Sequence, residues 1–471
     1  MQINILNSDT ICAIATPHGM GAIATVRVSG TKAFPIVAAL FQHRGKFLEI
    51  SEIVSHKAYH GHLINKGELL DEVLVTFFKA PHSFTGEDSA EISVHGSVFV
   101  QQKLLQVLIA NGCRMAEAGE FTRRAFVNGK FDLAQAEAIA DLISSESEAA
   151  HRVAINQLRG GFSKELQVLR SKLLEMTSLM ELELDFSEED VEFADRSQLK
   201  ALLQEALDKV NRLKDSFRLG NAIKNGVPVA IVGQTNTGKS TLLNALLGED
   251  RAIVSDIAGT TRDTIEETLN VNGILFRFID TAGLRETEET IEKIGIERSY
   301  RKIAEATVVI GMLDATKDAE NLLLATHEIL ERIDLEHQQL ILCINKVDTL
   351  NDQGEALLGQ LRQDLDNDEI MVICLSAKHK FGLNDLYNTL KHSQPLSYPD
   401  ATLVTNVRHY EALLHASNSL GQVQQGLEMN IPTDLVSQDL REAIHYLGTI
   451  TGEITTDEVL GSIFSRFCIG K

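Results

Sequence analysis

The stretch Val229–Leu246 reads VAIVGQTNTGKSTLLNAL and decides the fold of the middle of the chain. Four apolar residues lead into the loop Gly233–Ser240, and a leucine-rich helical pattern follows. A strand, a glycine-bounded loop and a helix are the setting in which GxxxxGK[ST] binds phosphate. Glycines let backbone N–H groups curl around the phosphates, the lysine reaches the β- and γ-phosphates, and the serine hydroxyl ligates Mg²⁺. The stretch therefore predicts a site for a nucleoside triphosphate.

Further motifs follow in the order expected of a GTP-binding domain, which argues against a chance match. The threonine-rich segment Ala252–Asp263 has the position of a switch I loop, where we predict Thr261 as the threonine that completes the Mg²⁺ shell. A strand then ends in DTAG. There Asp280 can hold Mg²⁺ through water, and the Gly283 N–H can contact the γ-phosphate.

The last two motifs specify the base. NKVD at Asn345–Asp348 and SAK at Ser376–Lys378 each follow a predicted strand. The Asp348 carboxylate can accept hydrogen bonds from both guanine N1–H and the 2-amino group, a pair that adenine does not offer. We therefore predict an α/β domain at residues 226–392 that binds GTP, and we reject the ATP alternative.

One position indicates unusual hydrolysis. Ras-like enzymes place a glutamine directly after the DTAG-type glycine to orient the attacking water. Here that position holds Leu284, which cannot orient anything. The nearby carboxylates are those of Glu286, Glu288, Glu289 and Glu292, and the residues alone do not choose among them.

Composition limits the function classes. A chain of 471 residues predicts roughly two to four domains. Its net charge of −22 argues against a protein that coats nucleic acid non-specifically. Five cysteines without a CxxC pair favour a reducing compartment and argue against a zinc site or disulfide framework. With neither an apolar run long enough to span a membrane nor a targeting sequence, we expect a soluble cytoplasmic protein.

The flanks of the GTP-binding domain differ from each other in pattern. Residues 1–120 predict an α/β domain, in which Arg27, Glu91 and His95 lie on or next to strands. By residue type alone, each is more often a surface or paired charge than a ligand. The expected strands are Ile11–Ala15, Ala22–Val28, Val73–Phe78 and Ala90–Val94, with a helix at Val98–Ala110.

Helical patterns lie on both sides of the GTP-binding domain. The segment Leu133–Phe186 is almost continuously helical in pattern, with a break at Gly160-Gly161, and Leu199–Arg218 is a further amphipathic helix. Thr405–Gln424 and Leu435–Tyr446 are helical again. This order of elements predicts one helical domain built from both flanks, with the GTP-binding domain inserted in it.

Strings along the whole chain support a more specific comparison. They are ATPHGMGAIATVRVSG, PHSFTGEDSAEISVHG, GEFTRRAFVNGKFDLAQAEAIADLI, DIAGTTRD, DTAGLRE, EKIGIERS and the terminal FCIGK. In these strings the chain resembles the bacterial tRNA-modification GTPases of the MnmE/TrmE family. Several of them lie outside the GTPase core, and this separates the family from other GTPases.

The resemblance implies a fold of the α/β plus all-α class. A tetrahydrofolate-binding and dimerisation domain is expected at 1–120, and a Ras-like P-loop G domain at 226–392. The G domain is inserted between the two parts of a helical domain, 121–225 and 393–471.

The resemblance also implies an activity. The expected protein is a potassium-activated GTP hydrolase and a homodimer that acts on tRNA. It is expected to form a heterotetramer or larger complex with an FAD protein of the MnmG/GidA type. Together they install an aminomethyl-type group, carboxymethylaminomethyl, at carbon 5 of the wobble uridine (position 34). The one-carbon unit comes from a 5-formyl or methylene form of tetrahydrofolate.

Individual residues acquire roles from the same resemblance. Glu292 is expected to orient the attacking water, and Cys468 to take part in the modification chemistry. Predicted GTP-binding residues are Gly233, Asn236, Thr237, Gly238, Lys239, Ser240, Thr241, Ser255, Thr260, Thr261, Asp280, Gly283, Asn345, Lys346, Asp348, Ser376, Ala377 and Lys378. Predicted Mg²⁺ ligands are Ser240 and Thr261, and predicted K⁺ ligands are Asn236, Ser255, Ile257 and Thr260. Predicted folate-binding residues are Arg27, Glu91, Lys130 and Lys471.

Two other function classes fit less of the chain. The terminal CIGK has the spacing of a lipidation signal, but its glycine and final lysine do not suit one. A ribosome-assembly GTPase, acting as a binding switch, explains the G domain and Leu284 but leaves Cys468 and the N-terminal strings unexplained. The tRNA expectation rests on the resemblance, with local basic support from Arg123, Arg124, Lys130, Arg152 and Arg159.

Overall fold

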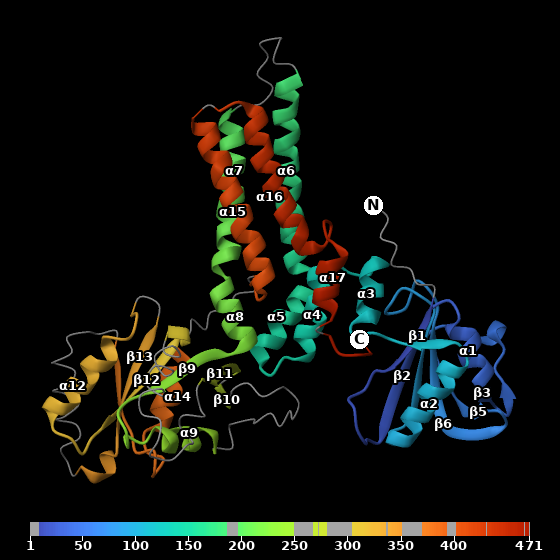
Figure 1. Ribbon diagram of the computed structural model, residues 1–471, viewed down its shortest axis with the longest axis horizontal. Coiled ribbons are helices and arrows are strands. Elements are labelled where there is room, and N and C mark those ends of the chain that lie inside the picture. The colour runs from blue at the N-terminus through green and yellow to red at the C-terminus, as the bar shows by residue number, and fades with distance from the viewer. Residues whose placement is uncertain are drawn as a thin grey trace. The chain divides into compact units, whose positions relative to one another are not determined.

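Two β-sheets and a set of long helices make up the chain in the computed structural model (Figure 1). The structure describes residues 9–185, 196–248, 267–271, 273–279, 304–335, 338–350, 370–392, 402–429, 431–465 and 467–470. The chain divides into two units. The first comprises residues up to Ala140, Gln157–Ala206 and the part from His415 onward, and the second comprises Asp141–Asn156 and Leu207–Leu414.

The first unit contains an eight-stranded sheet in the order β4-β3-β5-β6-β7-β2-β1-β8, antiparallel except for the β1–β8 pair. Helices α1 (Ala33–Leu40) and α2 (Val98–Ala110) cover one face and bury a core with the strands. On the other face, Phe121 of α3 (Glu120–Val127) packs against β1. The strands are β1 (Thr10–Ile14), β2 (Ile23–Ser29), β3 (Phe41–His43), β4 (Lys46–Phe47), β5 (Lys57–Asn65), β6 (Glu68–Phe78), β7 (Ser89–His95) and β8 (Cys113–Met115).

The strands and helix expected from apolar runs in this sheet are confirmed as β1, β2, β6, β7 and α2. The sequence pattern missed α1, β3, β4, β5 and β8. In β5, buried Tyr59, Gly61 and Leu63 alternate with exposed histidines and other residues, so the strand has no apolar run to detect.

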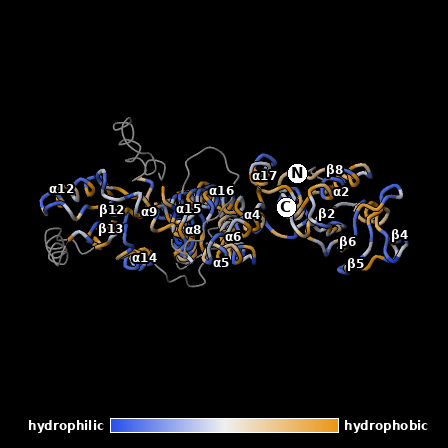
Figure 2. Tube along the Cα trace, turned by 90° about the horizontal axis from the view of Figure 1, so that it is seen from below, coloured by the Kyte–Doolittle hydropathy of each residue, from blue (hydrophilic) through white to orange (hydrophobic). Residues whose placement is uncertain are grey.

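Two groups of helices lie along the chain, one before and one after residues 227–374, which contain the strands of the second sheet. They are α4 (Leu133–Ile143), α5 (Glu148–Leu158), α6 (Gly161–Asp185), α7 (Arg196–Asp215), α8 (Phe217–Asn225), α15 (Val407–Glu428), α16 (Thr433–Thr451) and α17 (Asp457–Phe464). Within the first unit α6 packs along α16, and α17 packs on α3. Hydrophobic and hydrophilic residues are mixed along these helices, as their amphipathic patterns predict (Figure 2).

The break at Gly160 is confirmed, but a second break between α4 and α5 was missed. The Ser144 and Ser145 hydroxyls donate to the carbonyls of Asp141 and Leu142 at the end of α4. The Ser147 hydroxyl accepts from the Ala150 N–H at the start of α5. Serine side chains therefore satisfy backbone groups at this break, which carries no glycine or proline.

The second unit contains a six-stranded sheet in the order β10-β11-β9-β12-β13-β14, parallel except for the β10–β11 hairpin. Its strands are β9 (Val227–Val232), β10 (Glu267–Val271), β11 (Ile274–Phe278), β12 (Val308–Asp314), β13 (Gln339–Asn345) and β14 (Met371–Cys374). Helices α9 (Lys239–Leu247) and α14 (Leu383–His392) cover one face, and α12 (Ala319–Leu330) covers the other.

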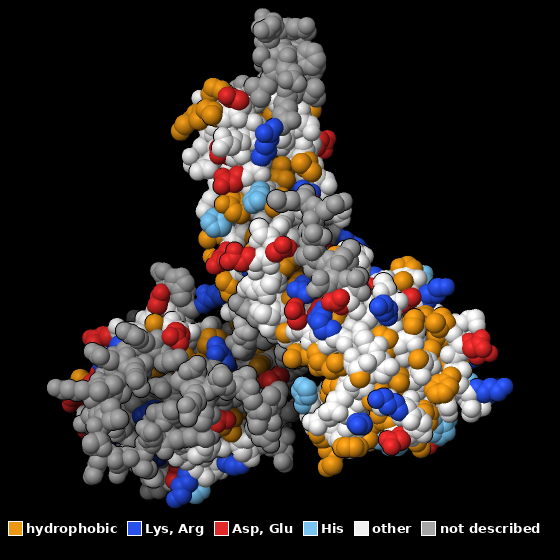
Figure 3. All heavy atoms as spheres, turned by 45° about the vertical axis from the view of Figure 1, so that its right-hand side comes forward, with side chains coloured by type: hydrophobic (Ala, Val, Ile, Leu, Met, Phe, Trp, Pro, Cys, Tyr) orange, Lys and Arg blue, Asp and Glu red, His pale blue; other side chains and the backbone are white. Residues whose placement is uncertain are grey.

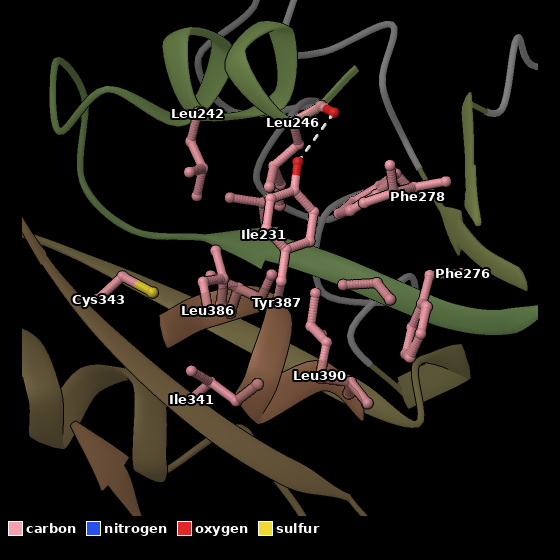
Figure 4. Close-up of a cluster of buried hydrophobic side chains, with 14 of the residues drawn as sticks. Ile231, Leu242, Leu246, Phe276, Phe278, Ile341, Cys343, Leu386, Tyr387 and Leu390 are labelled. Carbon is pink, nitrogen blue, oxygen red and sulfur yellow. Dashed lines mark hydrogen bonds between the residues drawn. The ribbon is translucent and has the colours of Figure 1, made fainter. Parts of the chain in front are cut away.

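The core between this sheet and its helices holds the P-loop helix in place (Figure 4). Leu242 and Leu246 of α9 are buried with Leu386 and Leu390 of α14. The Tyr387 hydroxyl donates to the Leu246 carbonyl at 3.2 Å, which satisfies a carbonyl in the last turn of α9.

The predicted fold class is confirmed. A P-loop sheet lies in the chain between helices α8 and α15, and an α/β sheet precedes the helices. In the described part of the chain, no helix combines the length and apolar character that spanning a membrane requires.

Candidate functional site

The P-loop lies at the carboxyl end of β9, in the centre of the six-stranded sheet. Gly233 has a φ of +145°, and a Cβ there would lie 2.4 Å from the Met312 carbonyl oxygen. Gly238 has a φ of +100°, and its Cβ would lie 2.2 Å from Asn345 Nδ2. A side chain at position 233 would collide with the backbone of β12, and one at position 238 would displace the Asn345 amide. Both residues also have a positive φ, which favours glycine.

Lys239 is the first residue of α9, and its side chain turns back over the loop. Its Nζ donates to the carbonyls of Gly233 at 2.9 Å and Gln234 at 2.8 Å. Burial lowers the pKa of Lys239, because the charged form loses hydration. A phosphate beside this ammonium would favour its charged form, as the motif predicts.

Asn345 connects three of the predicted motifs. Its Nδ2 donates to the Thr237 carbonyl of the P-loop at 2.8 Å, and its Oδ1 accepts from the Ala377 N–H at 3.0 Å. The side chain sits at the end of β13 and is buried. One amide therefore fixes the phosphate loop against the segment expected to contact guanine.

Lys346 makes a second link to the P-loop. Its backbone is left-handed, with a φ of +68°. Its Nζ donates to the Asn236 carbonyl and to Asp314 Oδ2, each at 2.7 Å. Burial alone would raise the pKa of Asp314, but the hydrogen bonds from Lys346 and Thr316 lower it overall. Asp314 was not predicted from the sequence, because this aspartate at the end of β12 belongs to no motif.

Asp348 is held ready to accept hydrogen bonds. The Ser376 hydroxyl donates to its Oδ1 at 2.5 Å, and this bond is the main reason why the pKa of Asp348 is lowered. His379 Nε2 lies 3.6 Å from Oδ2, a neighbour that the motifs did not predict. An ionised carboxylate with partly exposed oxygens suits the two donors of guanine.

The comparisons with known proteins cover the whole chain. A model described as MnmE helical domain matches residues 133–468, and one described as GTP-binding protein TrmE N-terminus matches residues 10–130. The protein named tRNA modification GTPase MnmE from Bacteroides fragilis strain ATCC 25285 is 54% identical over 469 residues, which cover 99% of this chain and 100% of the relative. The chain belongs to the MnmE family. This assignment confirms the resemblance and favours it over the ribosome-assembly alternative.

Other MnmE relatives match to a similar extent. The protein of that name from Bacteroides thetaiotaomicron is 52% identical over 468 residues, covering 99% of this chain and 100% of the relative.

Among solved structures, the FeoB G-domain from Methanococcus jannaschii is 28% identical to this chain. The match covers 36% of this chain and 96% of the FeoB chain, with a TM-score of 0.25.

The predicted MnmE folate residues Arg27 and Glu91 meet on the N-terminal sheet. They lie opposite each other on β2 and β7, and Arg27 Nε and Nη2 donate to Glu91 Oε1 at 3.0 and 2.8 Å. The rings of Phe84 and Phe121 lie 4.9 and 5.7 Å from the Arg27 guanidinium carbon. As their residue types suggested, the two charges are paired, and the pair is flanked by aromatic rings.

Lys130 lies at the loop that carries Phe84. Its Nζ donates to the Pro81 carbonyl at 2.9 Å, and the Phe84 ring is 6.0 Å from that of Phe131. The structure therefore brings three of the four predicted folate residues to one region, since Phe84 touches Arg27 and its loop holds Lys130.

The C-terminal motif lies against the N-terminal sheet. Ile469 forms an antiparallel bridge with Ala118, and the Gly119 N–H donates to the Cys468 carbonyl at 3.4 Å. Gly470 has a φ of +101°, and a Cβ there would lie 2.2 Å from the Ile14 carbonyl oxygen. Cys468 is exposed beside the start of α3.

Several predicted residues lie outside the described part of the chain. They are Ser255, Ile257, Thr260, Thr261, Asp280, Gly283, Glu292 and Lys471, together with Leu284.

Three of the five basic residues that were expected to support tRNA binding form ion pairs in the structure. Arg123 pairs with Glu117 and Arg152 with Glu148, while Arg124 pairs with two buried or half-buried glutamates. On the face drawn in Figure 3, Lys and Arg side chains are interspersed with Asp and Glu. Acidic partners therefore offset part of the local positive charge, and only one of them, Glu87, is distant in sequence from its arginine.

Proposed function

We propose that the chain is a potassium-activated GTP hydrolase that acts with a flavoprotein partner to modify the wobble uridine of tRNA. The observation that carries this proposal is the Asn345 amide, which joins the P-loop to the guanine-binding segment in a chain matching MnmE proteins along its length. The MnmE relatives are named tRNA modification GTPases, and we extend that activity to this chain.

At the nucleotide, Lys239 would neutralise phosphate charge, and Ser240 with Thr261 would hold Mg²⁺. Asn236, Ser255, Ile257 and Thr260 would hold K⁺, which when bound supplies positive charge beside the phosphates. Asn236 fits this role, because its side chain is exposed and makes no hydrogen bond with the described residues. With Leu284 in the usual glutamine position, Glu292 would orient the attacking water.

The tRNA chemistry is assigned to the first unit. Arg27, Glu91, Lys130 and Lys471 would bind a 5-formyl or methylene tetrahydrofolate, which supplies the one-carbon unit. The fit is supported by the Arg27–Glu91 pair and its aromatic neighbours. The product is a carboxymethylaminomethyl-type group at carbon 5 of uridine 34. We further propose that a cytoplasmic homodimer works with an FAD protein of the MnmG/GidA type, and that Cys468 takes part in the modification.

The hydrolytic part is tested by measuring GTP turnover in KCl and in NaCl. We expect turnover in K⁺ to exceed that in Na⁺ by about tenfold or more, because a correctly sized cation replaces a missing positive side chain. Equal rates in the two salts would remove the potassium proposal.

The role of Glu292 is tested by Glu292→Ala, with Glu320→Ala, an exposed glutamate on α12, as the matched control. Glu292→Ala should lower the turnover number about a hundredfold with little change in GTP affinity, because only the oriented water is lost. Normal turnover in this variant would show that another group orients the water.

A further inference from the structure

Residues 119–130 hold the loop Ala80–Asp88 at three separate points. Arg124 Nη1 lies 3.2 Å from both carboxylate oxygens of Glu87. The Asn128 side chain donates to the Thr85 carbonyl at 2.7 Å, and Lys130 Nζ donates to the Pro81 carbonyl. Side-chain hydrogen bonds therefore join the loop that contains FTGED to the segment FTRRAFVNGK.

Gly86 shows how closely these two segments approach. It has a φ of +79°, and a Cβ there would lie 3.0 Å from Asn128 Cβ and 3.5 Å from Lys130 Cδ. A larger residue would strain the backbone and press on both side chains. The loop and the segment after α3 are therefore packed to contact at this point.

The same contacts reach the strand that carries Arg27. Glu87 Oε2 accepts from the Ser29 hydroxyl at 2.8 Å, and the Ser29 and Thr85 hydroxyls are 2.7 Å apart. Ser29 lies two residues after Arg27 on β2, so the two side chains point to the same face of the sheet. Glu87 therefore contacts both Arg124 and the strand that carries Arg27.

Arg27 itself lies between the two segments. Phe84 comes from the loop and Phe121 from α3, and their rings flank its guanidinium. Arg124 of α3 links the helix to the loop through Glu87, and it also donates to Glu120 at 2.9 Å and to the Asp9 carbonyl at 2.9 Å. A guanidinium has enough donors in a fixed fork for all three acceptors, whereas a lysine ammonium on a flexible stem does not reproduce that geometry.

We infer that Arg124 is a positioning residue for folate binding: through Glu87 it sets the loop that carries Phe84 against Arg27 and holds Lys130 in place. This inference rests on the proposed function. Arg124 itself would not touch the folate. Its loss should weaken folate binding indirectly, by disturbing the positions of Phe84, Arg27 and Lys130.

The experiment compares Arg124→Lys and Glu87→Gln with the wild-type chain and with Arg170→Lys. Arg170 is a matched control, because it is a half-buried arginine of the same unit that pairs with Glu453 on another segment. The dissociation constant for 5-formyltetrahydrofolate is measured by calorimetry well below the thermal unfolding temperature of each variant. Circular dichroism and GTP turnover confirm that each variant is folded.

We expect Arg124→Lys and Glu87→Gln to raise the dissociation constant about tenfold, roughly the effect of losing one charged hydrogen bond, and Arg170→Lys to leave it within about twofold. Unchanged folate binding in folded Arg124→Lys would overturn the inference alone. A wild-type chain that binds no folate would overturn the folate proposal as well. If Arg124→Lys does not fold, Glu87→Gln carries the test, because it weakens the same ion pair from the other side. Weaker folate binding is then expected, and unchanged binding would contradict the inference.

Discussion

At the scale of single residues, Asp348 is the side chain that we propose selects the base. Its carboxylate is partly exposed, and the hydrogen bond from the Ser376 hydroxyl is the main cause that lowers its pKa. A change at this one position therefore tests the proposed specificity for guanine.

Asp348→Asn should exchange base specificity. The asparagine amide offers one acceptor and one donor group where guanine needs two acceptors, so GTP affinity should fall by at least about tenfold. Affinity for xanthosine triphosphate, whose base carries an oxygen in place of the 2-amino group, should rise. Both affinities are measured by fluorescent-nucleotide displacement.

Asp318→Asn is the matched control for this change, because Asp318 caps α12 through the Asn321 N–H and asparagine can do the same. GTP binding should be normal in the control. If Asp348→Asn retained full preference for GTP, the assignment of Asp348 to the base would be wrong.

The motif residues of the candidate site could be found from the sequence, because Gly233, Lys239 and Asp348 lie in short patterns of fixed spacing. Asp314 and His379 could not be found, because only the fold brings them to Lys346 and Asp348. The pairing of Arg124 with Glu87 was missed for the same reason.

At the scale of elements, the strongly apolar strands and the long amphipathic helices were predictable. The strand β5 was not, because its buried residues alternate with exposed ones and leave no apolar run. The break between α4 and α5 was not predicted either, because single serine side chains, and no glycine or proline, satisfy the backbone there.

The free energy of unfolding should fall in acid, because Glu120 of α3 is paired as a carboxylate with Arg114 and Arg124. Burial raises the pKa of Glu120, but hydrogen bonds from Arg114, the Glu117 N–H and Arg124 lower it from 4.5 to about 2. The charged form therefore contributes stability above about pH 4.5 that is lost as the pH falls toward 2, on the order of 3 kcal/mol in all. Unfolding by urea is measured between these pH values.

Glu120→Gln should lower stability at neutral pH and flatten this acid dependence. Glu117→Gln changes the same residue type at a side chain that is 66% exposed, and should leave the dependence in place. An acid limb that persists unchanged in Glu120→Gln would assign it to other carboxyl groups.

The packing of helix α14 should contribute strongly to the stability of the P-loop sheet. Leu386 is fully buried in the core shown in Figure 4, so Leu386→Ala should cost about 2–5 kcal/mol of unfolding free energy. Leu324→Ala, at a leucine that is 59% exposed on α12, should cost less than about 1 kcal/mol. Similar costs for the two changes, measured by urea unfolding, would contradict the core packing described here.

At the scale of the whole molecule, the family and the fold class followed from strings spread over the chain, and both are confirmed. The division at residues 120, 225 and 392 stays a prediction. In the structure, Asp141–Asn156 belongs to the same unit as the nucleotide-binding sheet. The β10–β11 hairpin contacts this segment, because the Ala149 N–H donates to the Gly273 carbonyl.

GTP hydrolysis and tRNA modification should be separable by mutation, because we propose that they take place in different units of the chain. Cys468→Ser should leave GTP turnover unchanged, because Cys468 belongs to the first unit and the P-loop to the second. The same variant should fail to restore tRNA modification in cells that lack the chain. Restored modification would reduce Cys468 to a structural role in the C-terminal motif.

The most direct test is mass spectrometry of wobble uridines in tRNA from cells that lack this chain. We expect nucleosides with a carboxymethylaminomethyl-type group at carbon 5 to disappear, and the wild-type gene to restore them. A P-loop variant, Lys239→Ala, should fail to restore them, because the proposed modification depends on GTP binding and turnover, in which this lysine would neutralise phosphate charge. Wobble uridines that stay fully modified without the chain would contradict the proposed function.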